Sequence, residues 1–462
     1  MTEKKIIKPA LLGGFRDLLP SEAIKLREVA AKIVAVYERF GFVPLETPCM
    51  ERWDVLTGDD PDFNKSIFRA QVARGAEDKD QDIGEGENFA LRFDLTVPLA
   101  RVVAAYPKLP RPFKRWQLGR VFRGERPQAG RFREFYQLDF DTIGANSVTA
   151  DAEVIQVMYE VMKALGIENF LIRFNTRRVL NGLAEMVGCG GKAKEVFRII
   201  DKLDKVGLDG VLQELRRQPD NQFDENALAL SEEQAAKVRA FLELKSDNAD
   251  ELLRQLTDFF GAGDSPSGNA GVEELATIVQ ILTSLNIPQR YWRLDLSVAR
   301  GLDYYTGPVF ETTLTDCPEL GSVLSGGRFD GLTDRFMEGS NIAGVGASVG
   351  VDRLLVGMEK LGLVSQRQSV SQVLVTVFNA ELEMGSLKLA QELRQAGVNA
   401  EVYLGNDATL RAQLAYATRQ EIPLVVVIGP DEAARGQVQL KNMAERRQEL
   451  LTKEELLAKL KA

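Results

Sequence analysis

The chain has 462 residues, of which 45% are hydrophobic and 27% are charged, and its formal net charge is −9. These values are typical of a globular protein with two to four domains, and they exclude a surface that binds nucleic acid non-specifically over its whole extent. An RNA-binding function would therefore need a local basic surface. No run approaches the roughly 20 apolar residues of a membrane helix, and the first residues lack a signal-peptide core. We therefore expect a cytoplasmic protein without a membrane anchor.

Two features of the composition restrict the chemistry. Cys49, Cys189 and Cys317 are far apart in the chain, which argues against a disulfide framework or a cysteine metal site and fits a reducing compartment. The chain contains no histidine. A Ser-His-Asp triad, a histidine-ligated metal and an imidazole base are therefore excluded. Catalysis must use fixed charges, carboxylates, lysine or groups of the substrate.

The first predicted elements are a helix, a short strand-like run and a loop. Residues 21–40 carry an amphipathic pattern between a candidate N-cap, Ser21, and a candidate stop, Gly41. The next run, GFVPLETPCMER at 41–52, contains two prolines, which restrict it to an edge or an interface. Residues 58–88 are polar and acidic, and we expect a mobile surface loop there.

Two later segments alternate polar and apolar residues. Residues 88–101 are predicted as a strand with Arg92, Asp94 and Thr96 on one face. Residues 114–141 are predicted as strand, loop and strand, and basic residues dominate the first half. In the second half, one face of the strand is polar and the opposite face is apolar. The polar face contains Phe135, Gln137, Asp139 and Asp141. Arginines that approach an acidic face suit a substrate with an anionic part and a cationic or hydrogen-bonding part.

The middle of the chain changes from sheet to helix and back. Residues 151–166 are predicted to be helical, and helical patterns then dominate residues 176–286, which we interpret as an inserted subdomain with a flexible break at 261–271. The sheet resumes near residue 291 with two strands around a tight polar turn.

The glycine-rich segments after this point are expected to let the backbone pass close to another group. One is LSGGRFDGL at 324–332, and the other is AGVGASVGVDRLL at 343–355, a strand that leads into a helix near Arg353. Residues 360–372 have the composition of a linker. Beyond them, strands and helices alternate, which predicts a small, mostly parallel sheet in an independent domain.

Three blocks of the sequence resemble the three motifs of class II aminoacyl-tRNA synthetases. They are PLETPCMER, FRGERPQAGRFREFYQLDFD and GVGASVGVDRLL, and the third has the form GxGxSxGxxR. ARGLDYYTG at 299–307, SGGRFDGL at 325–332 and GFRDLLP at 14–20 narrow the resemblance to the histidyl-tRNA synthetase family. It covers essentially the whole chain. FYQLDFD and DKLDKVG are closer to the archaeal and eukaryotic-type branch of that family.

The resemblance implies an α+β fold, in which an antiparallel sheet flanked by helices carries a helical insertion and a C-terminal α/β anticodon-binding domain. It also implies a homodimer built through the first motif near Pro48. The expected division is 1–175 for the first part of the catalytic core, 176–288 for the helical insertion, 289–360 for the second part of the core, 361–372 for the linker and 373–462 for the anticodon-binding domain.

The implied reaction has two steps: the carboxylate of L-histidine attacks the α-phosphate of ATP, and the histidyl group then passes to the 3′ end of tRNA(His). Fixed cations suit the charge that gathers on the phosphate. The resemblance assigns Arg123 and Arg300 to the α-phosphate, and Mg²⁺ to the outer phosphates. It also assigns ATP contacts to Glu125, Arg131, Phe135 and Arg353. Arg126, Arg131 and Arg133 remain open to three roles, namely a solvated loop, a contact with the acceptor end of tRNA, or an ATP contact, the last being favoured for Arg131.

For histidine, the resemblance implies that Asp94, Thr96 and Gln137 surround the α-amino group. Asp141 and Tyr305 would contact the imidazole, with Tyr304 as support and Arg300 nearby. Taken singly, aspartates of this kind are more typical of surfaces. The combined pattern favours ligands at Asp94 and Asp141, but not clearly at Asp139. Gly124 departs from the motif, which often has a larger polar or aromatic residue there.

Two other functions use the same fold. A catalytically silent paralogue regulates ATP phosphoribosyltransferase, but it typically lacks the C-terminal domain that this chain has. A synthetase-like tRNA sensor is joined to a regulatory domain, and nothing in the 462 residues supplies one. The retained arginines at 123, 300 and 353 also favour an active ligase.

Overall fold

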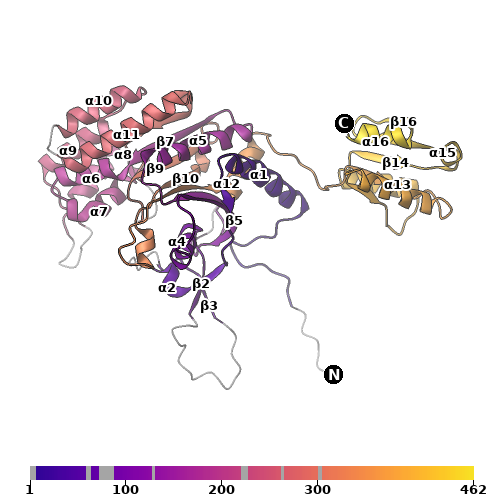
Figure 1. The fold of residues 1–462 in the computed structure, drawn as a ribbon, viewed down its shortest axis with the longest axis horizontal. Coiled ribbons are helices and arrows are strands. Elements are labelled where there is room, and N and C mark those ends of the chain that lie inside the picture. The colour runs from indigo at the N-terminus through magenta and orange to yellow at the C-terminus, as the bar shows by residue number, and fades with distance from the viewer. Residues whose placement is uncertain are drawn as a thin grey trace, which may run out of the picture. The chain divides into compact units, whose positions relative to one another are not determined.

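The structure is a computed structural model that describes residues 7–58, 64–71, 88–126, 131–219, 227–261, 265–299 and 304–461. It divides into two compact units (Figure 1). The first comprises Met1–Arg16 with Val29–Leu363, and the second comprises Asp17–Glu28 with Val364–Ala462. Among the described helices, none combines the length and the apolar character that crossing a membrane requires.

An eight-stranded sheet organises the first unit, and its strand order is β1-β5-β6-β11-β10-β9-β7-β8. Neighbours pair antiparallel except at the two edges, where β1 pairs with β5 and β8 with β7 in parallel. The sheet and its flanking helices confirm the predicted α+β class. The strands are β1 (Val43–Pro44), β5 (Phe113–Phe122), β6 (Glu134–Ile143), β7 (Phe170–Thr176), β8 (Trp292–Leu294), β9 (Pro308–Leu314), β10 (Ser322–Arg328) and β11 (Gly344–Gly350).

Helices α1 (Pro20–Arg39), α5 (Val148–Ala164) and α12 (Val351–Lys360) pack near this sheet. Tyr37 of α1 is fully buried against the Phe140 ring, with 4.7 Å between the ring centroids. Leu138 and Phe140 are also fully buried, so the alternation predicted for β6 is confirmed: its apolar face meets the core. The other face of β6 is left for polar residues.

A second, three-stranded sheet with order β2-β4-β3 lies in the same unit. Its strands are β2 (Met50–Arg52), β3 (Arg69–Ala70) and β4 (Phe89–Leu91), and helices α2 (Trp53–Leu56) and α4 (Thr96–Ala105) accompany it. The loop prediction for 58–88 is therefore wrong at β3, and much of the rest of that segment lies outside the described residues.

The strand predicted over 88–101 ends early, at Leu91. The chain turns instead, because Asp94 Oδ1 accepts a hydrogen bond of 3.1 Å from the Val97 backbone nitrogen and satisfies the first turn of α4. Arg92 then points away from the polar face: its Nη1 donates to the Thr47 carbonyl at 2.7 Å and its Nε to the Arg120 carbonyl at 2.8 Å. Arg92 is thus a buried structural residue.

The helical character predicted for residues 176–286 is confirmed by a group of helices beside β7 (Figure 1). Glycines permit the close packing there, since a Cβ on Gly182 of α6 would lie 2.5 Å from the Gly268 Cα of α11. The break predicted at 261–271 is wrong from Pro266 onwards, where α11 begins. The helices are α6 (Arg177–Met186), α7 (Ala193–Ile200), α8 (Leu203–Arg216), α9 (Glu232–Glu243), α10 (Ala249–Phe260) and α11 (Pro266–Ser284).

The two strands predicted around residues 291–314 exist, but they do not form a hairpin. β7 lies between them, pairing with β8 on one side and with β9 on the other. The segment that joins them is longer than a tight turn, and residues 300–303 lie outside the described part. The close approaches predicted at the glycine-rich strands are confirmed, because a Cβ on Gly326 of β10 would collide with the Gly346 carbonyl of β11.

The second unit contains the predicted α/β sheet, with order β13-β12-β14-β15-β16. Its first three strands are parallel, and β15 and β16 form an antiparallel hairpin. Apolar clusters that include Val373 and Leu374 pack on the sheet. The elements are β12 (Val373–Val375), α13 (Glu383–Gln395), β13 (Ala400–Val402), α14 (Leu410–Arg419), β14 (Leu424–Val427), α15 (Pro430–Arg435), β15 (Gln437–Asn442), β16 (Arg447–Thr452) and α16 (Lys453–Lys461).

Candidate active site

A cavity of about 1090 Å³ opens over the polar face of the eight-stranded sheet. Its lining carries charges of both signs. Arg123, Arg131 and Arg353 lie close enough to interact electrostatically, as do Asp94, Asp139 and Asp141, and Arg123 also acts on Asp94. We call the three arginines the arginine end of the cavity and the three aspartates its carboxylate end. Such a cavity suits a ligand, or a pair of ligands, with one anionic and one cationic part.

The arginine end is built from β5, the loop after it and α12. Arg123 Nε donates to the Phe93 carbonyl at 3.1 Å, and Arg353 Nη1 donates to the Ser322 carbonyl at 2.7 Å. Burial, together with the positive charges of Arg131 and Arg123, lowers the pKa of Arg353 from its usual value. Like charges held together in this way favour an anion as their counterion.

Each of the two predicted adenine residues contacts an arginine of this end. The Arg123 guanidinium stacks over the Phe135 ring, 5.2 Å from its centroid. Arg131 forms an ion pair with Glu125. Neither Phe135 nor Glu125 lines the cavity, whereas Arg131 does. The structure thus brings Arg123, Arg131 and Arg353 together, and leaves the two adenine contacts as predictions.

The carboxylate end is deeply buried. Asp94, Asp139 and Asp141 are each at most 3% exposed. Arg115 of β5, fully buried, lies beside Asp141 in the β5–β6 register, with 2.7 Å between Arg115 Nη2 and Asp141 Oδ2. The same Nη2 donates to the Leu95 carbonyl at 3.0 Å.

Several polar atoms at this end have no hydrogen-bond partner. They are Gln137 Oε1, Asp139 Oδ1 and Asp141 Oδ2, together with Arg115 Nε and Nη1. The short Arg115–Asp141 contact lacks the alignment of a hydrogen bond, so it leaves Asp141 Oδ2 able to accept one. Buried acceptors without donors are costly, which is why they are expected to face a ligand.

The carboxyl groups here are less acidic than usual. Burial raises the pKa of Asp94, against hydrogen bonds from Val97 and Tyr304. Burial, opposed by Arg115, raises the pKa of Asp139 to about 7 and that of Asp141 to about 6. Burial therefore favours the protonated forms of these carboxyls in the empty cavity, and a cationic group that enters it would favour their ionised forms.

The remaining predicted histidine residues line the same end. Tyr304 donates from its hydroxyl to Asp94 Oδ2 at 3.0 Å, and its ring meets that of Tyr305 edge-on at 5.1 Å. Gln137 Nε2 donates to Ser348 Oγ at 2.8 Å. Thr96, Tyr304, Tyr305 and Gln137 all line the cavity. Tyr304 thus supports Asp94 directly as well as packing on Tyr305.

Glycines leave room for these side chains. A Cβ on Gly346 would collide with Asp141 Oδ1, and a Cβ on Gly327 would lie 2.8 Å from the Tyr305 ring. Gly124, the departure from the motif, donates from its backbone nitrogen to the Ser66 carbonyl at 2.7 Å, and a Cβ there would lie 3.0 Å from that oxygen. A backbone contact therefore occupies the space of the missing side chain.

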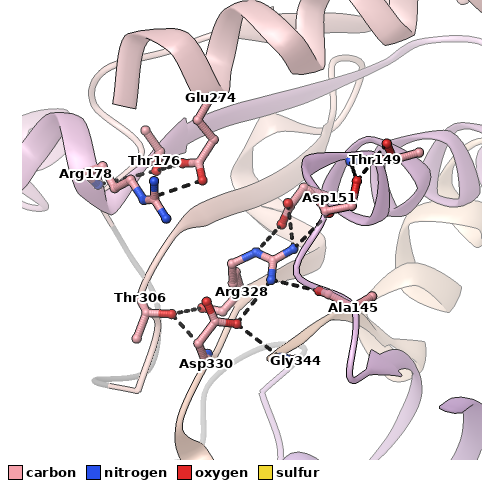
Figure 2. Close-up of polar contacts among 11 residues, drawn as sticks. Ala145, Thr149, Asp151, Thr176, Arg178, Glu274, Thr306, Arg328, Asp330 and Gly344 are labelled. Atoms are coloured by element: carbon pink, nitrogen blue, oxygen red, sulfur yellow. Dashed lines mark hydrogen bonds and ion pairs between the residues drawn. The ribbon is translucent and has the colours of Figure 1, made fainter. Parts of the chain in front are cut away.

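A second buried polar group supports the segment that carries the tyrosines (Figure 2). Arg328 donates to both carboxylate oxygens of Asp151, at 2.9 and 2.7 Å, and to Asp330 at 3.1 Å. The Arg328 carbonyl accepts from the Thr306 nitrogen at 2.8 Å, and the Asp330 nitrogen donates to Thr306 Oγ1 at 3.0 Å. This network fixes the backbone next to Tyr305.

Some site residues were not predicted, and one predicted residue is not described. Arg115 was not singled out from the sequence, because its place opposite Asp141 depends on the β5–β6 register, which the sequence pattern does not supply. Lys194 and Arg198 of α7 also line the cavity, so the helical insertion contributes to its wall. Arg300 lies outside the described residues, and its assignment stays a prediction.

Comparisons with known proteins find similar sequences and structures over nearly the whole chain. The profile of the histidyl-tRNA synthetase family matches residues 14–354, and that of an anticodon-binding domain matches 372–462. The chain is 42% identical to the histidine–tRNA ligase of Wolinella succinogenes, over 96% of each protein, and 38% identical to that of Clostridium tetani, over 99% of each. The crystal structure of histidyl-tRNA synthetase from Nostoc sp. PCC 7120 aligns with a TM-score of 0.84, at 34% identity and with 99% of both chains covered.

Proposed function

This chain belongs to the histidyl-tRNA synthetase family and is a class II, ATP-dependent histidine–tRNA ligase, and we propose how its residues divide the work. The observation that carries the proposal is the two-ended cavity. Its arginines suit ATP and the carboxylate of histidine, and its aspartates suit the ammonium and the ring.

In the first step, the histidine carboxylate attacks the α-phosphate and pyrophosphate leaves. Arg123 binds the α-phosphate, and Arg131 and Arg353 bind the outer phosphates. The lowered pKa of Arg353 and its neighbours' charges support this assignment, because an incoming polyanion relieves their repulsion. Arg300, Glu125 and Phe135 keep their predicted contacts with the α-phosphate and adenine.

The other end of the cavity selects histidine. Asp94, Thr96 and Gln137 hold the α-ammonium group, and Tyr304 orients Asp94 through its 3.0 Å hydrogen bond. Asp141 and Tyr305 hold the ring. A pocket of buried acceptors disfavours amino acids that bring no donors, by roughly 10⁴–10⁵ in sites of this kind.

No residue of the chain has to act as a base, because the attacking carboxylate is already ionised. The absence of histidine from the sequence is therefore compatible with the chemistry. Mg²⁺ is proposed to arrive with the outer phosphates of ATP. Within the described residues, no group of three or more Asp, Glu, Cys or His side chains is placed to hold a metal ion. We therefore assign no residue of the chain to the Mg²⁺ ion.

In the second step, the histidyl group passes to the 3′ end of tRNA(His). We assign the wall formed by Lys194 and Arg198 of α7 to the approach of that end, since cations there suit phosphates. The division predicted from the sequence remains our proposal: a core at 1–175 and 289–360, an insertion at 176–288, a linker at 361–372 and an anticodon-binding domain at 373–462.

Two further assignments remain proposals. The protein acts in the cytoplasm, and it forms a homodimer through the first motif near Pro48. The relatives named above are bacterial, so they give no support to the archaeal and eukaryotic-type branch suggested by FYQLDFD and DKLDKVG. A regulatory paralogue is disfavoured because the chain retains the arginine end and the C-terminal unit.

The direct test is ATP–pyrophosphate exchange with each amino acid in turn. We expect exchange with histidine alone. Exchange with none, or with another amino acid instead, would defeat the proposal. Charging of tRNA(His) by the same preparation tests the second step.

The role of Arg300 needs its own variant. Arg300→Ala should slow adenylation far more than it weakens histidine binding, because the arginine acts on charge that develops during the reaction. Single-turnover adenylation and equilibrium binding separate the two effects. An unchanged adenylation rate would remove Arg300 from the mechanism.

A further inference from the structure

A short N-terminal segment contacts the residues around the arginine end of the cavity. Residues 7–12 are exposed, whereas Gly14, Phe15 and Arg16 are half-buried against the first unit. The Phe15 ring meets the Phe68 ring edge-on, with 5.9 Å between the ring centroids. The described lining of the cavity includes none of these three residues. Any role of the segment in the reaction must therefore pass through the residues that it contacts.

Arg16 pairs with a buried carboxylate that joins two elements of the site. Arg16 Nη2 lies 2.5 Å from Asp352 Oδ1, and the Asp352 side chain is 6% exposed. The other oxygen, Asp352 Oδ2, accepts a hydrogen bond of 2.6 Å from the Tyr136 backbone nitrogen of β6. β11 pairs with β6 only as far as Gly350 opposite Gln137, so this carboxylate extends the pairing by one residue. Asp352 thus holds the start of α12 against β6.

The hydrogen bond from Tyr136 to Asp352 connects two residues that are assigned to ATP. Arg353 follows Asp352 directly in α12 and lines the cavity. Phe135 precedes Tyr136 directly in β6, and the Arg123 guanidinium stacks over its ring. The distance between Arg353 and the stacked pair therefore depends on the position of the Asp352 carboxylate.

Arg16 also contacts the loop between β5 and β6. Its guanidinium lies over the Phe132 ring, 4.1 Å from the centroid. One side chain thus packs on the loop and balances the charge of Asp352. Removing one member of a buried ion pair leaves the other charge uncompensated. Without Arg16, the Asp352 carboxylate is therefore expected to turn toward solvent and to weaken its hydrogen bond with Tyr136.

The same segment contacts Arg133, for which the sequence left three roles open. The Arg133 nitrogen donates to the Gly14 carbonyl at 2.8 Å, and the Arg133 carbonyl accepts from the Arg123 nitrogen at 2.8 Å. The Arg133 side chain donates to the Glu125 carbonyl at 3.1 Å and to the Gly13 carbonyl at 3.3 Å. Arg133 therefore links the N-terminal segment to the backbone of two residues assigned to ATP.

We propose that Arg16 is a positioning residue for ATP, and that residues 13–16 fix the arginine end of the cavity before ATP binds. The inference rests on the proposed assignment of Arg123 and Arg353 to the phosphates. Arg16 touches no substrate and acts through Asp352. Its loss should therefore weaken the ATP contacts and spare the histidine contacts at the carboxylate end.

The test compares Arg16→Met with the wild type in ATP–pyrophosphate exchange, using the full-length protein. Methionine is also a long, unbranched side chain, but it carries no charge. The KM for ATP should rise about tenfold, the size of one lost charged hydrogen bond, while the KM for histidine changes by less than about twofold. Arg16→Lys keeps the positive charge without the planar guanidinium, so it should recover part of the affinity for ATP.

Lys114→Met is the matched control. Lys114 Nζ also lies over an aromatic ring, 4.5 Å from the Phe42 centroid, and 2.8 Å from Glu153 Oε1. Its side chain is 22% exposed, against 28% for Arg16. Lys114 lies near the start of β5, at the opposite end of the strand from Arg123. Lys114→Met should change neither KM. A KM for ATP that rises no more in Arg16→Met than in this control would overturn the inference.

Gly14→Ala tests the second contact without removing a charge. Gly14 has a φ of 85°, and a Cβ there would lie 2.8 Å from Arg133 Cγ. Gly166 has a φ of 75°, and a Cβ there would meet no atom within 4 Å. Gly166→Ala therefore carries the backbone strain alone. Gly14→Ala should raise the KM for ATP, and Gly166→Ala should not.

The outcomes separate the inference from the proposed function. A wild-type protein that shows no exchange with histidine would defeat the proposed function itself. Wild-type exchange with equal rises of the two KM values in Arg16→Met would overturn the inference, because a general loss of structure affects both ends of the cavity. If Arg16→Met does not fold, Arg16→Lys and Gly14→Ala carry the test, and an unchanged KM for ATP in both would overturn the inference.

Discussion

Two buried polar clusters in the first unit have opposite hydrogen-bond balances. In the Arg328 cluster, formed by Arg328, Asp151 and Asp330, each guanidinium nitrogen donates to an oxygen within 3.3 Å (Figure 2). In the Asp139 cluster, formed by Asp139, Asp141 and Arg115, each member retains a buried polar atom without a partner.

This difference suggests that the Arg328 cluster stabilises the fold and that the Asp139 cluster binds a ligand. A buried ion pair whose hydrogen bonds are complete holds backbone segments in register, and removing one member leaves an uncompensated charge. A cluster with unmade hydrogen bonds costs stability in the free protein, and a ligand recovers that cost. The first cluster should therefore be sensitive in unfolding experiments, and the second in binding experiments.

The largest expected effect on stability comes from the Arg328 cluster. Arg328→Met leaves Asp151 buried and unpaired, and should lower the free energy of unfolding by about 3–5 kcal/mol. Chemical denaturation measures it. The double variant with Asp151→Leu should recover part of the loss, since it removes the orphaned charge. A loss below 1 kcal/mol for the single variant would show that this pair does not hold the fold.

The next effect belongs to the Asp139 cluster. Asp141→Asn should weaken histidine binding about 10- to 100-fold, because a charge-assisted hydrogen bond to the ring is lost. Its thermal midpoint without ligand should not fall, since the substitution removes a carboxylate that is costly to bury. Calorimetric titration and thermal unfolding give the two values. A large fall in the thermal midpoint with unchanged histidine affinity would show that Asp141 stabilises the fold and does not bind histidine.

A smaller effect is the pH dependence of stability in the ligand-free protein. Because the folded pKa values of Asp139 and Asp141 are raised, to about 7 and about 6, the folded state binds protons more readily than the unfolded state. Their stabilising contribution is complete below about pH 4 and is lost as the pH rises through 6 and 7. No imidazole titrates in this window, since the chain has no histidine.

Denaturation midpoints between pH 5 and 8 measure this dependence. Asp139→Asn should reduce the slope of the profile, and part of the slope should remain because the pKa values of Asp141 and Asp151 are also raised, to about 6. A wild-type profile that rises over this range would contradict the assigned shifts.

The smallest effect is expected at an exposed ion pair. Glu319 and Lys360 meet at 2.5 Å on the surface of the same unit, with side chains 57% and 48% exposed. Glu319→Gln should leave both the thermal midpoint and histidine affinity unchanged, because solvent screens such pairs. A measurable loss of thermal stability or of histidine affinity would show that the length of a contact, rather than burial and unmade hydrogen bonds, decides how much a charged residue contributes.

The position of a residue could be predicted from the sequence where it depends on neighbouring residues in the chain. Gln137, Asp139 and Asp141 were placed on one face because strand side chains alternate, and that rule needs only the sequence. Asp94 was placed on a strand, but its carboxylate ends the strand by satisfying the first turn of α4.

Long-range pairings were out of reach. Arg115 gains its importance from its register with β6, and Arg328 from Asp151, which is 177 residues away in the chain. The order of β7, β8 and β9 likewise depends on the whole sheet, so the tight turn predicted between the strands near residues 291–314 was wrong.

The most direct test of the comparison is a thermal-shift titration with histidine on Asp141→Asn and Asp151→Asn side by side. Binding to the folded state raises the midpoint, so one titration yields both stability and affinity. We predict that Asp141→Asn keeps its midpoint and loses most of the histidine-dependent shift, while Asp151→Asn loses its midpoint and keeps the shift. If both variants lose both properties equally, the distinction between complete and incomplete buried clusters is contradicted.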